Sequence, residues 1–452
     1  MKKKVAMVSL GCSKNLVDSE QMLGLLENAG YELCTDEAKA EILIVNTCTF
    51  IESAKDESIA CILEMAQHKK DGACKALVVT GCLAQRYREQ VLTELPEVDA
   101  VIGTNAYDQL LEVLSQLDGT ERPLVCPEAP LLAEGLPRVL STPPYTAYLR
   151  IAEGCDNHCT YCVIPSIRGR YRSRRMEDIL DEAAQLAAGG VRELIVIAQD
   201  TTRYGKDLYG RYCLPELLRA LCGIDGIAWV RVHYCYPELV DDALISVFAE
   251  EEKLCPYFDI PIQHCNDTVL KRMGRRANKE QITALIRKIR SEVPDAVIRT
   301  SLIVGFPGET EAQFQELCDF VREMRFDRLG VFAYSREEDT PAFDMDGQID
   351  EDEKVRRQEL LMLLQSEISE QNHQKKIGSV VRVLVEGRDE IIKQYYGRSA
   401  ADSIEIDGKV FFESKRRLTE GTFADVRITG ALEYDLFGVA AEETMGAQEA
   451  FL

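Results

Sequence analysis

Three cysteines stand close together near the middle of the chain, in the stretch EGCDNHCTYC. They are Cys155, Cys159 and Cys162, and their spacing lets three sulfur atoms converge on one metal centre. Zinc would need a fourth ligand, and His158, between Cys155 and Cys159, is poorly placed to supply it. A 4Fe–4S cluster fits better, because thiolates are its normal ligands and three of them leave one iron open for a substrate or cofactor. Three inert core thiols are the remaining interpretation.

A second set of three cysteines is spread over the N-terminal part of the chain. Cys12, Cys48 and Cys82 lie in SLGCSKN, IVNTCTF and VVTGCLA, each directly after a short apolar run. The carboxyl ends of parallel strands meet at one edge of a sheet, so three sulfurs that follow such strands can gather there. This placement predicts a second cluster. The alternative is three buried thiols, since cysteine is often buried.

The elements that would position the N-terminal cysteines alternate between strand and helix. The predicted strands are 4–10, 41–46, 75–80 and 99–104. Helical spacing separates them, as at 53–69 and 85–95. This pattern is typical of a parallel sheet with helices on its faces. We therefore expect an α/β domain over residues 1–125, followed by a proline-rich linker at 126–144.

A second alternating series predicts the domain that carries the clustered cysteines. Its predicted strands are 147–152, 193–198, 229–234, 257–262, 297–304 and 328–334. The helical stretches that separate them are 176–188, 215–222, 237–250, 279–293 and 311–324. Six β-α units in series predict an α/β partial (β/α)6 barrel over residues 145–375. Its chemistry is expected at the carboxyl ends of the strands, where the clustered cysteines follow the first strand.

The C-terminal part of the chain changes character. A charged helix is predicted at 351–376, and short β-rich pieces follow it. They predict a small β-barrel over residues 376–441, with a disordered tail at 442–452.

The charge of the chain limits its partners. A net charge of −23 repels phosphate backbones on average and favours a basic protein partner. The run RGRYRSRR, residues 168–175, holds five arginines. It could grip ribosomal RNA, a tRNA or an acidic substrate side chain, or form a solvated basic face.

The composition also bears on location. No apolar run approaches the roughly 18 residues of a membrane span. The apolar run after the first lysines is too short for a signal peptide. A cytoplasmic location is therefore expected, in which the sixteen cysteines are thiols or metal ligands rather than disulfides.

The spacing C-x3-C-x2-C after the first strand of a six-unit barrel resembles the signature of the radical S-adenosylmethionine superfamily. The resemblance implies that the open iron chelates S-adenosylmethionine, which is cleaved to a 5′-deoxyadenosyl radical. It also makes Gly305, Gly308 and Glu309, in IVGFPGE, contacts for this cofactor. Gln199 and Gln263 end the second and fourth predicted strands, and they are either polar contacts to the cofactor or surface residues.

Taken together, the three parts of the chain resemble the methylthiotransferases, which replace C–H by C–S–CH3 on a macromolecule. The terminal part resembles their TRAM domain. The resemblance implies two 4Fe–4S clusters, held by the two cysteine triplets, and S-adenosylmethionine as both methyl donor and radical source. A low-potential electron donor and a sulfur donor are implied as partners. The two clusters are expected to face each other.

The choice of substrate depends on finer motifs. GCSKNLVDSE, CVIPSIRGRYRSR and IAQDTTRYG resemble the branch that modifies the β-carbon of an aspartate in ribosomal protein S-twelve. The tRNA branches carry Gln-Met-Asn or Thr-Asn where this chain has Ser13, Lys14 and Asn15. Methylthiolation of an adenosine in tRNA is the alternative. A zinc-stabilised RNA-binding module is the alternative from another class.

Overall fold

The computed structural model describes residues 2–104, 106–117, 122–127 and 135–441. The chain forms two compact units. The first contains residues 1–239, 270–276 and 334–347, and the second contains residues 240–269, 277–333 and 348–452. The predicted tail at 442–452, and residues 128–134 of the predicted linker, lie outside the described residues. Within the described part of the chain, no helix has the length and apolar character that crossing a membrane requires.

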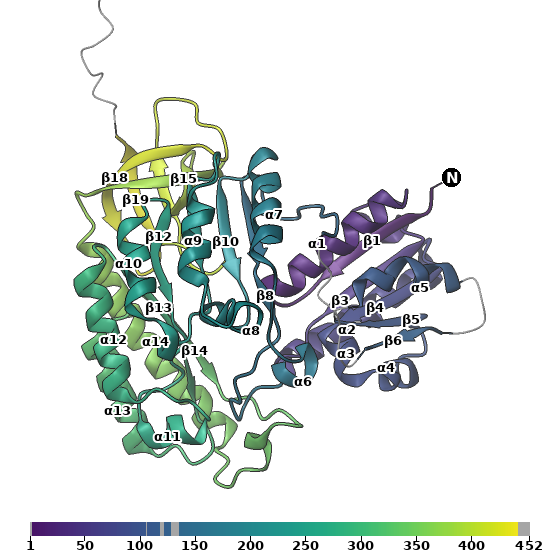
Figure 1. The fold of residues 1–452 in the computed structure, drawn as a ribbon, viewed down its shortest axis with the longest axis horizontal. Helices are drawn as coiled ribbons and strands as arrows, with labels where there is room; N and C mark the ends of the chain where they lie inside the picture. The colour runs from purple at the N-terminus through teal and green to yellow at the C-terminus, as the bar shows by residue number, and fades with distance from the viewer. Residues whose placement is uncertain (1, 105, 118–121, 128–134, 442–452) are drawn as a thin grey trace, which may run out of the picture. The chain divides into compact units, whose positions relative to one another are not determined.

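The N-terminal sheet of the first unit is fully parallel, as predicted (Figure 1). Its strand order is β2-β1-β3-β4-β5-β6. The strands are β1 (Lys4–Ser9), β2 (Glu32–Leu33), β3 (Ile42–Thr47), β4 (Ala76–Gly81), β5 (Ala100–Gly103) and β6 (Leu124–Val125). The four predicted strands are present with ends shifted by a residue. Strands β2 and β6 were missed, because two residues are too few to show a period.

Helices cover both faces of this sheet. They are α1 (Ser13–Asn28), α2 (Glu52–Asp71), α3 (Cys82–Tyr87), α4 (Glu89–Glu94) and α5 (Leu110–Gln116). Successive strand residues point to opposite faces, so Leu43 and Val45 pack in the core with α2 to α4 while Ile42 and Ile44 pack with α1 and α5. Burial on both faces explains why the strands read as unbroken apolar runs. The single helix predicted at 85–95 is wrong: Arg88, at φ +45°, divides it into α3 and α4.

The rest of the first unit begins the second α/β series. Strands β7 (Thr146–Arg150), β10 (Glu193–Ile197) and β11 (Trp229–Val232) pair in parallel in that order. The helices are α6 (Ile164–Arg168), α7 (Met176–Ala188), α8 (Lys206–Tyr209) and α9 (Leu214–Cys222). A short antiparallel pair, β8 (Ala152–Glu153) with β9 (Arg172–Ser173), was not predicted. It folds the arginine-rich run back alongside Glu153.

The second unit continues the series with three more parallel strands. They are β12 (Leu254–Asp259), β13 (Val297–Val304) and β14 (Arg328–Ala333). The helices of this part are α10 (Asp242–Glu250), α11 (Asp267–Arg272), α12 (Lys279–Glu292), α13 (Glu311–Met324) and α14 (Glu351–Gln374). Capping boxes at Asn278 and Thr310 satisfy the first backbone amides of α12 and α13, which explains why both helices begin where they were predicted.

The C-terminal strands close into a barrel, as predicted, drawn in yellow-green to yellow in Figure 1. The order around it is β15-β16-β17-β19-β18. The strands are β15 (Val380–Arg388), β16 (Tyr395–Ser399), β17 (Val410–Glu413), β18 (Phe423–Ala431) and β19 (Leu436–Ala440). Its interior is filled by Val383, Val410, Phe412, Val426 and other apolar side chains, so it encloses a packed core.

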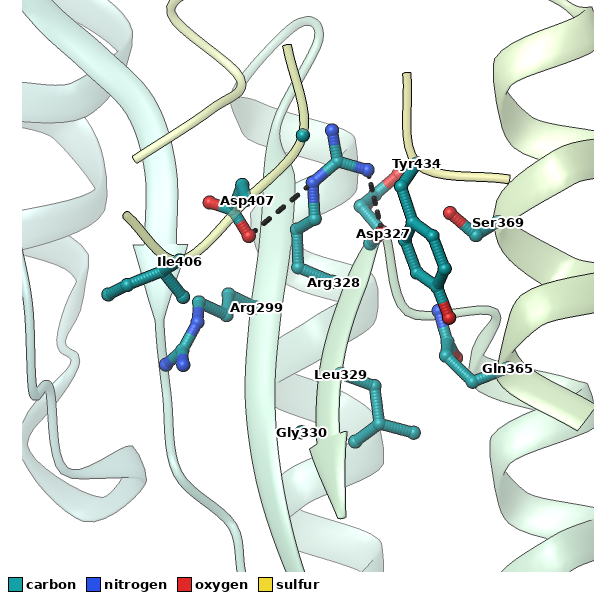
Figure 2. A pocket seen from close by; sticks show the side chains of 11 residues that line it. Arg299, Asp327, Arg328, Leu329, Gly330, Gln365, Ser369, Ile406, Asp407 and Tyr434 are labelled. Atoms are coloured by element: carbon teal, nitrogen blue, oxygen red, sulfur yellow. Dashed lines mark hydrogen bonds and ion pairs between the residues drawn. The ribbon is translucent and has the colours of Figure 1, made fainter. Parts of the chain in front are cut away.

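A buried polar network lies where β14, helix α14 and the loops of this barrel meet. Arg328 pairs with Asp402. It also lies 3.6 Å from Asp407, a contact that Figure 2 shows. Beside these groups is a cavity of about 290 Å³, whose lining includes Gln365 and Tyr434. It lies at the start of β13 and β14, at the opposite end of these strands from their carboxyl edge.

His373 completes this network and must be neutral to do so. Its Nδ1 donates to Leu432 O at 2.9 Å, and its Nε2 accepts from Arg328 Nη1 at 2.9 Å. Burial and the guanidinium charge therefore lower the pKa of His373 to about 4. The folded protein then binds this proton at lower pH than the unfolded chain, whose value is near 6.5.

We expect the stability of the protein to fall between pH 6.5 and pH 4, the range set by these two pKa values. The stabilisation is present above the unfolded pKa and is lost as the pH falls, and it amounts to on the order of 3 kcal/mol. Urea midpoints measured across this range should therefore decline, and H373Q, whose amide does not titrate, should flatten the decline. H68Q, at a half-buried histidine 3.8 Å from Asp71, is the control and should leave the slope unchanged. An equal slope in H373Q and the parent protein would contradict the assignment.

Candidate functional site

The N-terminal cysteines lie at the carboxyl ends of three adjacent strands. Cys12 follows β1, Cys48 follows β3 and Cys82 follows β4. The connections from β1 and β3 lead to opposite sides in the strand order, which makes this edge the switch point where doubly wound sheets bind ligands. The three cysteines thus follow adjacent strands at one edge of the sheet, as their positions in the sequence predict. A Cβ on Gly11, at φ +87°, would lie 2.9 Å from Cys48 Sγ, so only glycine lets the Cys12 turn approach so closely.

Burial sets the protonation of these thiols. It raises the pKa of Cys82 to about 12, with Cys12 and Cys48 near enough to add to the rise, while Arg168 opposes it. Burial also raises the pKa of Cys48. Cys12 is exposed at the open side of the group. Without metal, Cys48 and Cys82 are thus thiols at neutral pH, and a bound iron would displace their protons.

The second triplet occupies the loop between β8 and α6. Cys155 and Cys159 are buried and Cys162 is half-buried, whereas His158 is exposed. The loop is held by backbone bonds from Cys155 N to Gly169 O at 3.1 Å and from Thr160 N to Met273 O at 3.0 Å. The exposed position of His158 agrees with the sequence argument against its sharing an ion with Cys155 and Cys159.

Hydrogen-bond donors point at the sulfurs of both triplets. Asn157 N donates to Cys155 Sγ at 3.4 Å, and Tyr236 Oη lies 3.4 Å from Cys159 Sγ. Arg168 Nη2 donates to Cys82 Sγ at 3.5 Å. Such donors stabilise thiolates and are the means by which proteins tune iron–sulfur clusters. The residues present therefore fit thiolate-held clusters.

The geometry differs from that of a single-ion site. Across residues 2–104, 106–117, 122–127 and 135–441, no group of three or more His, Cys, Asp or Glu side chains is arranged to hold one metal ion. The thiolates around a cubane bind separate irons, so they need not converge on one point.

The two triplets lie next to one another. The side chain of Cys82 packs against Val163, the residue after Cys162, and against Ile167. Thr104 Oγ1 donates to Ile167 O at 3.0 Å and ties β5 to the same short helix α6. The first triplet therefore shares an apolar contact with the chain that carries the second.

A buried ionic network connects the two triplets. Arg168 donates to Asp18 at 2.8 Å, to Glu153 at 3.3 Å and to Asn15 Oδ1 at 2.9 Å. Arg150 contacts the same Asp18 and lies 3.1 Å from Glu153. Both carboxylates are 0% exposed, so each guanidinium compensates a charge that could not be buried alone.

The arginine-rich run at 168–175 is only partly exposed. Arg168 and Arg174 are buried, and Arg174 pairs with Glu182 at 2.6 Å. The interpretation of the whole run as a substrate grip or a solvated face is thus wrong for these two residues. Arg170 and Arg175 are exposed, as that interpretation required. Asp18, which pairs with Arg168, comes from a distant element that the sequence did not reveal as a partner.

Gln199 stands at the carboxyl end of β10, as predicted. Its Nε2 donates to Glu153 Oε1, and its own Oε1 is buried without a hydrogen-bond partner in the described part of the chain. An orphaned buried acceptor costs free energy unless a ligand satisfies it. The contact with Glu153 also places Gln199 beside the loop of the second triplet.

The remaining predicted cofactor residues belong to the second unit. Gly305 and Gly308 have φ of +72° and +78° in the turn after β13. Glu309 accepts from Gly305 N and lies 3.3 Å from both Arg357 and His264. Gln263 has φ of +69° and pairs by its backbone with β13, where Ile303 N donates to Gln263 O at 2.8 Å. The structure thus brings these four residues to one edge of the second unit.

Several residues at the site were missed by sequence reasoning. Lys14, Glu153, Tyr234, Tyr236 and Arg275 lie at or beside the two triplets. Lysine, glutamate and tyrosine are common on surfaces, and only their burial here distinguishes them. Lys14 and Glu153 lie within two residues of a triplet cysteine, which was the one available signal.

Family models match three parts of the chain. Residues 4–103 match "Uncharacterized protein family UPF0004", residues 149–321 match the radical SAM superfamily, and residues 377–440 match the TRAM domain. Among solved structures, the radical S-adenosylmethionine methyltransferase TsrM from Kitasatospora setae is similar, with a TM-score of 0.56 and 16% identity over 76% of this chain and 77% of that one. This likeness concerns the fold alone, and it confirms the predicted radical SAM fold class.

Curated relatives match nearly the whole chain. The ribosomal protein uS12 methylthiotransferase RimO of Lachnoclostridium phytofermentans is 54% identical over 97% of this chain and 100% of that protein. The RimO proteins of Clostridioides difficile and Pelotomaculum thermopropionicum are 52% and 53% identical, each over 96% of this chain and 98% of theirs. At this identity and coverage, the chain belongs to the RimO family of radical SAM methylthiotransferases.

Proposed function

We propose that this protein replaces a C–H bond by C–S–CH3 at the β-carbon of an aspartate in ribosomal protein uS12. The observation that carries the proposal is the pair of adjacent cysteine triplets, in which Cys82 packs on the residue after Cys162. The names of the full-length relatives support uS12 as the substrate. The net charge of −23 supports a basic protein partner over a nucleic acid.

The chemistry needs more than side chains. A hydrogen on the β-carbon beside an ionised carboxylate is far too weakly acidic for any protein base. Two 4Fe–4S clusters and S-adenosylmethionine, the cofactors of this family, supply the one-electron and methyl-transfer chemistry when bound. Cys155, Cys159 and Cys162 would hold the cluster that binds S-adenosylmethionine, and Cys12, Cys48 and Cys82 would hold the other.

Further residues of each unit are proposed as contacts for these groups. Gln199 offers its unpaired Oε1 to S-adenosylmethionine, because no described residue satisfies that atom. Gly305 and Gly308 let the cofactor approach the backbone closely, and Glu309 fixes their turn through its bond from Gly305 N. Gln263 adjoins that turn and adds a polar contact. Asn157 and Tyr236 hold the sulfurs of the second triplet.

Partners follow from the same chemistry. A one-electron reduction requires a low-potential electron donor, and the new C–S bond requires a sulfur donor. A ribosomal protein substrate supports a cytoplasmic location, at or near the small ribosomal subunit.

Mass spectrometry of a deletion strain tests the function. We expect uS12 from that strain to lack the methylthio group, and the full chain expressed in trans to restore it. Modified tRNA nucleosides should be unchanged. An aspartate of uS12 that stays modified in the deletion strain would overturn the proposal, and loss of a methylthio-adenosine would transfer the activity to tRNA. Colourless, zinc-containing protein from anaerobic purification would instead favour an RNA-binding module.

A further inference from the structure

Lys14 is a buried ammonium group that has no carboxylate in contact among the residues the structure describes. The residue is only 8% exposed. It lies in the first turn of α1, two residues after Cys12. In the described part of the chain, no carboxylate oxygen lies within 4.0 Å of its Nζ. Buried charges in proteins are normally paired, because removing an ammonium from water is costly. Lys14 therefore departs from the pattern that Arg150 and Arg168 follow in the same unit.

The position of Lys14 Nζ is fixed from two sides. Asn15, the next residue, donates to Leu10 O at 2.8 Å and to Thr47 O at 2.9 Å, which anchors the start of α1. Nζ lies 3.4 Å from the centre of the Tyr234 ring, and Tyr234 follows β11. Tyr234 has φ of +61°, a conformation that a bulky residue adopts only where its surroundings enforce it.

These contacts place the charge between the two triplets. Cys12 marks the carboxyl edge of the N-terminal sheet, and Tyr234 marks the carboxyl edge of the β7-β10-β11 strands. Tyr234, Cys12 and Glu153 are acidic groups within electrostatic range of Nζ, and Glu153 is the carboxylate among them. Its oxygens, however, already accept from Arg150, Arg168, Gln199 and Gly154 N. Among the described residues, the ammonium is thus held between the two triplets without a carboxylate in contact.

We propose that Lys14 binds the side-chain carboxylate of the aspartate that is methylthiolated, and so selects aspartate and positions its β-carbon. This assignment rests on the proposed function. A carboxylate would complete the ion pair that the protein leaves open, and the aromatic face of Tyr234 holds the ammonium in the absence of substrate. Cys12, two residues before Lys14, is exposed.

The test compares two forms of uS12 on anaerobically reconstituted enzyme. One carries the target aspartate, identified in the deletion-strain experiment, and the other carries asparagine there. Binding is measured by the anisotropy of labelled uS12, and methylthiolation by mass spectrometry. The parent enzyme should bind the aspartate form about 10- to 100-fold more tightly, since one charge-assisted hydrogen bond separates the two forms.

Variants at Lys14 should remove this preference selectively. K14Q should weaken binding of the aspartate form by about 10- to 100-fold and leave the asparagine form nearly unchanged. K14R should restore part of the preference, because it keeps the charge. K206Q is the matched control: Lys206 is exposed and its Nζ lies 5.4 Å from the Tyr212 ring, so it should behave like the parent enzyme.

The outcomes separate this proposal from the function on which it rests. A K14Q enzyme that loses affinity for both forms equally would show a structural role and overturn the proposal. So would loss of S-adenosylmethionine cleavage measured without uS12, since Lys14 would then serve the cofactor. If the parent enzyme leaves uS12 unmodified, the proposed function itself fails and the assignment of Lys14 falls with it.

Discussion

Alanine at Cys155, Cys159 and Cys162 together is expected to reduce cleavage of S-adenosylmethionine to background. Thiolates are the ligands that hold a 4Fe–4S cluster, and without this triplet no iron is left open for the cofactor. The assay is formation of 5′-deoxyadenosine by reduced, anaerobically reconstituted protein without uS12. The same substitutions should abolish methylthiolation of uS12.

Two control proteins accompany this experiment. C318A removes a buried thiol from α13 of the second unit, and it should leave cleavage unchanged. C12A/C48A/C82A should still form 5′-deoxyadenosine while losing methylthiolation, because it removes only the other triplet. Undiminished cleavage by the C155A/C159A/C162A protein would show that these cysteines do not serve the cofactor.

The second large effect concerns the buried network between the triplets. Asp18→Ala removes the carboxylate that pairs with the buried Arg150 and Arg168. It also removes the acceptor of the Tyr107 hydroxyl, 2.9 Å away. Breaking a buried ion pair by removing one partner costs about 3–5 kcal/mol. We therefore expect a clearly lower urea midpoint and melting temperature for D18A, and weaker retention of the N-terminal cluster because Arg168 also donates to Cys82.

The matched control for this substitution lies on the surface. Asp56 in α2 is exposed, so D56A should change stability by less than about 0.5 kcal/mol. If D18A unfolds at the same urea concentration as D56A, the network contributes nothing measurable and its role in joining the triplets is contradicted.

Much of the site could be predicted because its cysteines follow strands. Cys12, Cys48 and Cys82 each come directly after an apolar run, and the geometry of parallel sheets brings such positions together. The strand at 297–304 and the helices at 176–188 and 311–324 were predicted with their observed bounds, since apolar periodicity and capping residues agree there.

Other features depend on partners that lie far away in the sequence. Arg168 looks like a surface residue within RGRYRSRR, and its burial depends on Asp18, which precedes it by 150 residues. The break at Arg88 and the two-residue strands β8 and β9 leave no periodic signal. His373 lies in a charged helix. Its hydrogen bonds with Arg328 and Leu432, which the sequence does not show, require its imidazole to be neutral.

The most direct test of the account is the iron and sulfide content of the anaerobically reconstituted protein. Two clusters held by two cysteine triplets predict about eight irons per chain, with about four left in either C12A/C48A/C82A or C155A/C159A/C162A. About four irons in the parent protein, or an iron content that neither triple substitution lowers, would contradict the claim that each triplet holds its own cluster.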